Sequence, residues 1–291
     1  MQAFENKVCV VTGAASGFGR EFARKAASLG MRLVLADIEP GSLESCAEEL
    51  RQAGAEVMAQ QTDVSRADEV QSLADQSFAR FGAVHLLFNN AGVAAGGFLW
   101  EHTPADWQWV LGVNLMGVVH GVHSFVPRMI AQGDDSHVVN TASVAGLISP
   151  QLMGVYNVSK HAVVALSETL HHDLRVAGAS LGVSVLCPAF VPTGINRSER
   201  NRPEALRAST PATESMTTAQ RSLDQAVGSG RLDARAIAEL SFSAVRERRF
   251  YCLSHPKILG AVELRMQDIL QGRNPSDPFG ARPELAPKQR D

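Results

Sequence analysis

The side chains with the clearest potential for chemistry are Tyr156 and Lys160, which lie four positions apart in a segment with helical spacing. Residues at this spacing share one face of a helix, so the phenol and the amine are expected to be close together. Free tyrosine has a pKa of about 10, which is too high for an efficient base at neutral pH, and a nearby positive charge favours the tyrosinate. The pair therefore predicts a proton-handling centre for an alcohol or carbonyl substrate, although Tyr156 alone could be an amphipathic core residue.

A glycine-rich turn forms a second candidate site. Residues 12–19, with the sequence TGAASGFG, follow a strand-like run at 7–12 and open a segment with helical spacing at 18–29. Glycines in such a turn let the backbone approach a pyrophosphate, which then binds the free N–H groups at the helix N-terminus. The GxxxGxG spacing differs from the commoner GxGxxG, and by itself it also fits a tight strand–helix connection.

The acidic residue Asp37 ends the second strand-like run, and its position supports a dinucleotide-binding role for the glycine-rich turn. A carboxylate there accepts hydrogen bonds from the adenosine ribose hydroxyls and repels a 2′-phosphate. Ser16 and Ile38, where NADP sites usually offer a cation, are uncharged, whereas Arg20 lies near the phosphate turn. A surface turn acid before Pro40 is the alternative interpretation. We therefore predict NAD rather than NADP as the cofactor.

Short β-branched runs alternate with helical patterns along the chain, which predicts parallel strands joined by right-handed crossover helices. The expected strands are 7–12, 32–36, 56–62, 84–88, 137–141, 183–186 and 249–253. The expected helices are 18–29, 43–53, 65–81, 103–131 and 155–177. The fold class is therefore α/β, a doubly wound Rossmann fold with a mostly parallel sheet of about seven strands and helices on both faces.

Two of the expected helices have specific start signals. Ser65, with Asp68 three residues on, predicts a capping box for the third helix. Thr103 followed by Pro104 predicts a cap with proline at the first helical position.

No break in composition marks a second domain, so residues 1–271 are expected to form one Rossmann-type catalytic domain. Residues 192–232 are rich in Ser, Thr, Arg, Glu and Ala, and they are predicted to form a partly helical, mobile cap over the substrate. The tail at 272–291 contains four prolines and is expected to be poorly ordered.

Several motifs, in this order along the chain, resemble the single-domain branch of the short-chain dehydrogenase/reductase family over residues 5–195. The turn at 12–19 resembles the family's TGxxxGxG, residues 89–92 are its NNAG, and residues 156–160 are its YxxxK. The NNAG turn implies a brace for the sheet that also lines the cofactor. Together these motifs are far more specific than any one of them.

Other parts of the resemblance imply roles for single residues. Asp63 and Val64 resemble the acidic–apolar pair that holds the adenine, and Asn114 and Ser143 match two members of the family's catalytic tetrad. Ser143 would donate to the substrate oxygen as negative charge develops, and Asn114 would anchor a proton-relay water, although it could instead bond neighbouring backbone. The resemblance also implies that Lys160 bonds the nicotinamide ribose.

The candidate catalytic set is thus Asn114, Ser143, Tyr156 and Lys160. The residues expected to bind the cofactor are Gly13, Ser16, Gly17, Phe18, Gly19, Asp37, Ile38, Asp63, Val64, Asn90, Ala91, Gly92, Tyr156, Lys160, Pro188, Ala189, Val191 and Thr193. One of these departs from the family, whose usual Pro-Gly after the sixth strand is Pro188-Ala189 here. The extra methyl group is expected to narrow the nicotinamide side of the pocket.

Composition argues against other classes of protein. A formal net charge of −3 over 291 residues argues against nucleic acid as a partner. No apolar run reaches the roughly 18 residues that span a bilayer, and the polar start leaves no room for a signal peptide, so we expect a cytoplasmic protein without a membrane partner. The four cysteines form no CxxC pair and no His cluster has zinc-ligand spacing, so no metal is expected.

The substrate is expected to be a neutral, hydrophobic secondary alcohol or its ketone, aromatic or alicyclic. Loop residues expected near the active centre are apolar, without Arg or Lys to bind a carboxylate; they are Ala94, Ala95, Phe98, Val144, Leu147, Met153 and Phe190. Alternatives are an NADPH-dependent carbonyl reductase and a non-catalytic nucleotide-binding regulator on the same fold. The resemblance implies a homotetramer or dimer, joined partly through the helices that begin near Thr103 and Val155.

Overall fold

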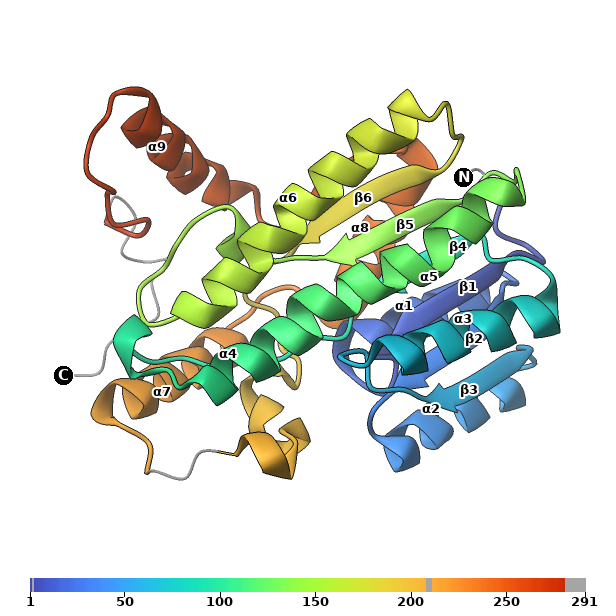
Figure 1. Ribbon diagram of the computed structural model, residues 1–291, viewed down its shortest axis with the longest axis horizontal. Coiled ribbons are helices and arrows are strands. Elements are labelled where there is room, and N and C mark those ends of the chain that lie inside the picture. Colours follow the sequence, from blue (N-terminus) through green and yellow to red (C-terminus); the bar gives the residue numbers. More distant parts are fainter. Residues whose placement is uncertain (2, 208–210, 281–291) are drawn as a thin grey trace.

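A seven-stranded parallel sheet lies at the centre of the computed structural model, which describes residues 1, 3–207 and 211–280 (Figure 1). Its strand order is β3-β2-β1-β4-β5-β6-β7. The strands are β1 (Val8–Thr12), β2 (Arg32–Asp37), β3 (Val57–Gln61), β4 (Leu86–Asn89), β5 (His137–Thr141), β6 (Gly182–Cys187) and β7 (Tyr251–Leu253). The predicted Rossmann fold is confirmed.

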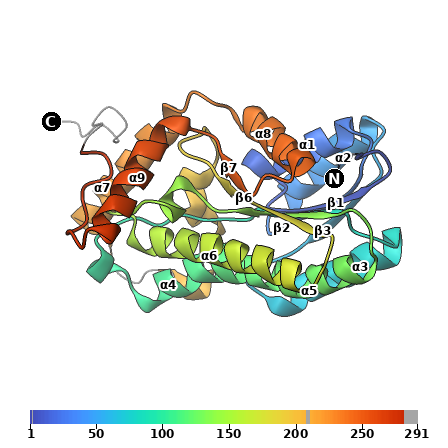
Figure 2. The same cartoon turned by 90° about the horizontal axis from the view of Figure 1, so that it is seen from above.

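Helices cover both faces of the sheet (Figure 2). One layer contains α1 (Gly17–Ser28), α2 (Pro40–Gln52) and α8 (Ala234–Glu247), and the other contains α3 (Ala67–Phe81), α5 (Gly117–Ala131) and α6 (Gly154–Val176). The remaining helical segments are η1 (Leu99–Glu101), α4 (Pro104–Leu111), η2 (Gly112–Met116), η3 (Val144–Gly146), η4 (Ile195–Asn201), η5 (Glu204–Leu206), α7 (Glu214–Gly228), η6 (Pro256–Ile258) and α9 (Leu259–Leu270). Figure 1 shows α4, α7 and α9 at the end toward which β5 and β6 point.

Each face of the sheet has its own apolar core. On the side of α1 and α8, the ring of Phe88 stacks on Phe22 at 4.3 Å between centroids and contacts Phe242 at 5.5 Å. On the other side, Leu73 of α3 and Phe125 of α5 are fully buried in a second cluster with β1 and β5 residues. Burial on both faces explains why the strands read as nearly continuous apolar runs.

The order of the strands determines where a ligand can bind. The chain proceeds from β1 outward through β2 and β3, and it then returns to β4 on the other side of β1. At such a switch point the loops after the two central strands diverge and leave a crevice at their carboxyl ends. The glycine-rich turn follows β1, and Asn90 follows β4, so both predicted motifs lie at this crevice.

The predicted capping box at Ser65 is wrong, because α3 begins at Ala67 after Arg66. The Ser65 hydroxyl and backbone N–H instead donate to the Asp63 carboxylate at 2.7 and 2.9 Å. The Ser65 hydroxyl therefore makes its hydrogen bond within a local turn that precedes the helix. The start at Thr103 is confirmed, and Asp106 completes a capping box there.

The long helix expected at 103–131 forms with one interruption, a π-helical turn at η2 that separates α4 from α5. Within Pro104–Ala131, one window of 18 residues is apolar enough on average to cross a membrane, with mean hydropathy 1.4, although polar residues interrupt it. Half of that window is buried, and the helices pack against α3 and α6. These contacts account for its apolar character as a core helix.

The first part of the proline-containing tail is packed rather than loose. The Ser276 N–H donates to Asp268 of α9 at 2.9 Å, and the Phe279 side chain is buried. This corrects the expectation of poor order from Gly272 onward for the residues up to Gly280. Residues 281–291 lie outside the described part of the chain, so the expectation is not tested for them.

Candidate active site

A cavity of about 590 Å³ opens at the carboxyl ends of the central strands and collects most of the predicted site residues. All the predicted cofactor-binding residues except Gly19 line it, as do Ser143, Tyr156 and Lys160 of the catalytic set. Asn114 does not line it. Of the expected substrate residues, Ala94, Val144, Met153 and Phe190 line the cavity, whereas Ala95, Phe98 and Leu147 do not.

The glycine-rich turn has a shape that only glycines allow. Gly13 and Gly17 have φ values of 67° and 53°, and a Cβ atom on Gly13 would lie 2.8 Å from the Ala91 Cα. Ser16 is the N-cap of α1 but makes no side-chain cap bond, so the first N–H groups of the helix have no side-chain partner there. This arrangement fits the pyrophosphate of a dinucleotide.

Gly19 was predicted to contact the cofactor, but its role in the structure is to allow close packing. A Cβ atom at this position would lie 2.0 Å from the Gly13 carbonyl oxygen. The missing side chain therefore lets α1 approach the turn, and Gly19 shapes the cavity without lining it.

Asp37 connects the end of β2 to the glycine-rich turn. Its carboxylate accepts hydrogen bonds from the Ala15 N–H at 2.9 Å and the Glu39 N–H at 3.0 Å. The side chain lines the cavity, and burial raises the pKa of its carboxyl group while the backbone donors oppose that rise. Each oxygen retains a further lone pair, which fits an acceptor for ribose hydroxyls.

Two arginines lie near this end of the site. Arg20 is absent from the cavity lining and forms an ion pair with Glu49 of α2, so it is engaged elsewhere. Arg200 of η4 does line the cavity, beside Asp37 and Glu39. Its Nε donates to the Glu39 carboxylate at 2.9 Å. Among the described lining residues, Lys160 and Arg200 carry positive charge. The sequence had indicated Arg20 as the cation near this end, and it did not indicate Arg200.

Asn90 braces the three strands that carry the site. Its side-chain amide donates to the Thr12 carbonyl oxygen at 2.9 Å and its oxygen accepts from the Thr141 hydroxyl at 3.3 Å. The Asn90 backbone N–H donates to the Thr12 hydroxyl at 2.9 Å. These bonds link the ends of β1, β4 and β5, the bracing that the NNAG resemblance implied.

Lys160 is almost fully buried where α6 crosses the end of β5. Its Nζ donates to the Thr141 carbonyl oxygen at 2.9 Å and lies 5.6 Å from the centroid of the Tyr156 ring. Burial lowers the pKa of the Lys160 amine to about 8. The two side chains therefore meet on one helix face, as their spacing predicted.

The pKa of Tyr156 moves in the direction opposite to the sequence expectation. Burial raises it, and a hydrogen bond with Ser143 opposes that rise. Desolvation of the phenolate exceeds the help that the chain alone provides. An additional positive charge, of the kind that an oxidised nicotinamide would supply, would oppose this rise in the Tyr156 pKa.

Ser143 follows β5 directly and is positioned by backbone. Its hydroxyl oxygen accepts from the Ala145 N–H at 3.1 Å, and the hydroxyl donates toward the Pro188 carbonyl at 3.4 Å. The second contact is long, so the hydroxyl is able to exchange it for a stronger acceptor such as a substrate oxygen. Ser143 thus holds a donor beside Tyr156.

Asn114 is fully buried in the π-helical turn and braces the site from behind. Its oxygen accepts from the Val93 N–H at 2.8 Å, and its amide donates to the Val93 carbonyl at 2.9 Å and the Ser159 hydroxyl at 3.0 Å. Val93 lies 21 positions from Asn114 in sequence, so these are long-range bonds and not the bond to neighbouring backbone that was weighed from the sequence. A Cβ atom on Gly92 would lie 3.4 Å from the Asn114 oxygen and 3.6 Å from the Lys160 Nζ, so both groups lie close to this glycine.

Two segments besides the predicted loop residues line the substrate side of the cavity. The first lies within 192–232, the segment predicted to form a partly helical cap over the substrate, and the second was not predicted. One is α7, whose Ala219, Leu223, Ala226 and Val227 line the cavity. Their spacing is that of one apolar helix face, a signal that was present in the sequence. The other is the tail, through Asp277 and Phe279, and no local pattern marks these residues.

Comparison with known proteins agrees with this geometry. The short chain dehydrogenase family model matches residues 7–204. A CLA biosynthesis dehydrogenase/reductase from Lactiplantibacillus plantarum is 34% identical over 273 residues, covering 93% of this chain and 95% of that protein.

Two solved structures extend the comparison to cofactors. A short chain dehydrogenase/reductase from Burkholderia phymatum in complex with NAD is 60% identical with a TM-score of 0.94, covering 95% of this chain and 99% of that one. An alcohol dehydrogenase from Thermococcus sibiricus complexed with 5-hydroxy-NADP is 25% identical with a TM-score of 0.69, covering 86% and 96%. The chain therefore belongs to the short-chain dehydrogenase/reductase family and is an NAD(P)-dependent oxidoreductase that acts on hydroxyl groups.

Proposed function

We propose that this protein interconverts a neutral, hydrophobic secondary alcohol and its ketone, with NAD(H) as coenzyme. The observation that carries the proposal is the composition of the cavity, which joins an acidic end at Asp37 to apolar walls through Tyr156 and Ser143. A dinucleotide fits the first part and an apolar alcohol the second.

The chain's own residues handle the proton and the substrate oxygen. When bound, the nicotinamide accepts the hydride from the alcohol carbon or returns one to the ketone. Tyr156 takes the hydroxyl proton in oxidation and gives it back in reduction, while Ser143 donates to the substrate oxygen as charge develops. Lys160 supplies positive charge beside the phenol. Asn114 fixes the backbone of Val93 and the Ser159 hydroxyl by hydrogen bonds.

Two features support a neutral substrate. The walls formed by the segment after η3, by α7 and by the tail include four apolar residues, Ile148, Leu223, Val227 and Phe279. The described charged residue that lines this part of the cavity is Asp277, whose carboxylate disfavours an anionic ligand.

Cofactor choice depends on the charges around Asp37. Its carboxylate disfavours a 2′-phosphate, and the positive charge of Arg200 is offset by its ion pair with Glu39. Arg200 is also the observation that favours the second candidate function, an NADPH-dependent carbonyl reductase, because a guanidinium released from Glu39 would bind a phosphate.

Steady-state kinetics test both halves of the proposal. We expect wild-type protein to oxidise 1-phenylethanol more efficiently with NAD⁺ than with NADP⁺, and to prefer it to mandelate, in which a carboxylate replaces the methyl group. Asp37→Ala is expected to lower the ratio of kcat/KM values for NAD⁺ over NADP⁺ by about tenfold, the equivalent of 1.4 kcal/mol. A wild-type preference for NADP⁺, or for mandelate, would contradict the proposal.

A further inference from the structure

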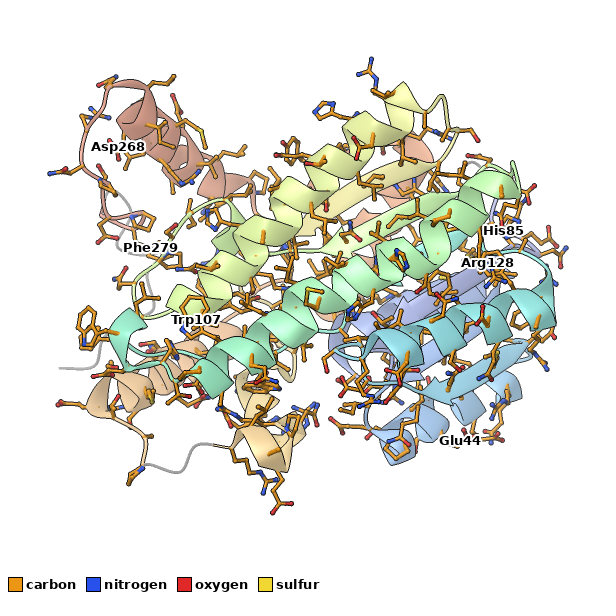
Figure 3. The ribbon with its side chains drawn as sticks, viewed as in Figure 1. Glu44, His85, Trp107, Arg128, Asp268 and Phe279 are labelled. Atoms are coloured by element: carbon orange, nitrogen blue, oxygen red, sulfur yellow. The ribbon has the colours of Figure 1, made fainter. Side chains whose placement is uncertain are left out.

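The tail residue Phe279 is packed into the protein at a place that bears on the substrate. Its side chain is 5% exposed and belongs to an apolar cluster with Val144, Ile148 and Ile258. Val144 directly follows Ser143, the proposed donor to the substrate oxygen. Figure 3 shows Phe279 on the segment that runs back from α9 toward the start of α6. A residue more than 130 positions from Ser143 in sequence therefore packs against its neighbour.

Phe279 is also part of the cavity wall. It lines the cavity together with Ile148 and Val144, whereas its cluster partner Ile258 does not. Ala189, which stands where the family usually has glycine, packs against the same cluster. The Phe279 ring thus belongs both to a cluster against which α9 packs through Ala261 and Val262 and to the wall of the cavity.

Specific hydrogen bonds hold the tail in this place. The buried Asp268 of α9 accepts from the Arg273 Nε at 2.9 Å and from the Ser276 N–H at 2.9 Å. The Asp277 carboxylate then accepts from the Phe279 N–H at 3.0 Å, which fixes the turn that directs the ring inward. The position of Phe279 is therefore built by the chain rather than left to a loose end.

We propose that Phe279 sets the size of the alcohol that this protein accepts. The proposal rests on the function given above and adds a specificity-determining residue to it. The ring occupies space next to Ser143 that a bulkier substrate would need. A smaller side chain at this position opens that space, and a larger one reduces it. A single methylene in an apolar pocket changes selectivity by about tenfold or more, so a whole ring has a large expected effect.

The test is a size series at this position. Phe279→Ala, Phe279→Leu and Phe279→Trp are compared with wild type by kcat/KM for 1-(2-naphthyl)ethanol and 1-phenylethanol with NAD⁺. We expect the naphthyl-to-phenyl ratio to rise about tenfold or more in the alanine variant, to rise less with leucine and to fall with tryptophan. A ratio that does not follow side-chain size across the four proteins would overturn the proposal.

The matched control is Ile258→Ala, which loosens the same cluster without removing a cavity-lining side chain. It is expected to lower thermal stability while leaving the naphthyl-to-phenyl ratio unchanged. If it shifts the ratio as far as Phe279→Ala does, Phe279 acts only through packing and the proposal is wrong.

A second readout separates this proposal from the proposed function. Binding of acetophenone and 2-acetonaphthone is followed by quenching of tryptophan fluorescence, which needs no turnover. If wild type oxidises neither alcohol, the proposed function fails, yet the ratio of the two dissociation constants still reports whether residue 279 limits ligand size. If the alcohols are oxidised, but neither the kcat/KM ratio nor the ratio of dissociation constants changes with the size of residue 279, only the Phe279 proposal fails.

Discussion

Replacing Lys160 with methionine isolates the energetic cost of the charge at the centre of the site. Methionine has a similar length and no charge, so it fills the space left by the lysine stem. Burial lowers the pKa of the Lys160 amine from 10.5 to about 8. Because the folded state holds the proton less tightly than the unfolded state, the charged amine destabilises the fold.

The size and the pH range of this effect follow from the two pKa values. One pKa unit corresponds to about 1.4 kcal/mol, so the charged amine costs about 3 kcal/mol below pH 8, where it is protonated in both states. Between pH 8 and 10.5 the folded state releases its proton first, and the cost declines to zero. Methionine also leaves the Thr141 carbonyl without its Nζ donor, which costs about 1–2 kcal/mol. We therefore expect Lys160→Met to be about 1–2 kcal/mol more stable than wild type at pH 7, and to lose that advantage as the pH rises toward 10.

Urea unfolding followed by circular dichroism at pH 7, 8.5 and 9.5 measures this difference directly. Lys257→Met is the control, because it makes the same substitution at an exposed position away from the cavity. The same Lys160→Met protein is expected to lose most of its activity, since its phenol has no neighbouring charge. A variant no more stable than wild type at pH 7, or a difference that stays constant with pH, would refute the reasoning.

Three further perturbations test other parts of the molecule. Tyr156→Phe is expected to lower kcat by about 10²–10⁴-fold while NADH binding by fluorescence stays unchanged, and full activity would exclude Tyr156 as the proton donor. Gly121→Ala is expected to destabilise the fold by about 1–3 kcal/mol in urea, because its Cβ would lie 2.0 Å from the Asn89 side-chain oxygen; an unchanged midpoint would contradict this packing. Arg202→Met is expected to cost about 3–5 kcal/mol, because it leaves the buried Asp106 carboxylate without its ion pair, and a loss below 1 kcal/mol would show that the pair is not buried in solution.

Local patterns in the sequence determined the elements and much of the site. Alternating β-branched runs and helical segments indicated the order of strands and helices, because hydrophobic periodicity depends on neighbours along the chain. The glycines of residues 12–19 indicated a turn that only glycine adopts, and the positive φ angles of Gly13 and Gly17 agree. The spacing of Tyr156 and Lys160 placed the two groups on one helix face, and both line the same cavity.

Three features of the site depend on the three-dimensional fold: the pKa of Tyr156, the hydrogen bonds of Asn114 and the part of the cavity wall that the tail forms. The direction of the Tyr156 pKa depends on how deeply α6 buries the phenol, which no spacing reports. Asn114 is in sequence a helical asparagine, and its bonds to Val93 and Ser159 arise because three separate segments meet at that turn. In the sequence Phe279 is part of a proline-containing tail. It lines the cavity because the segment after α9 folds back and packs against Val144 of η3. Contacts between residues this far apart in the chain leave no periodic trace in the sequence, and they form part of the cavity wall.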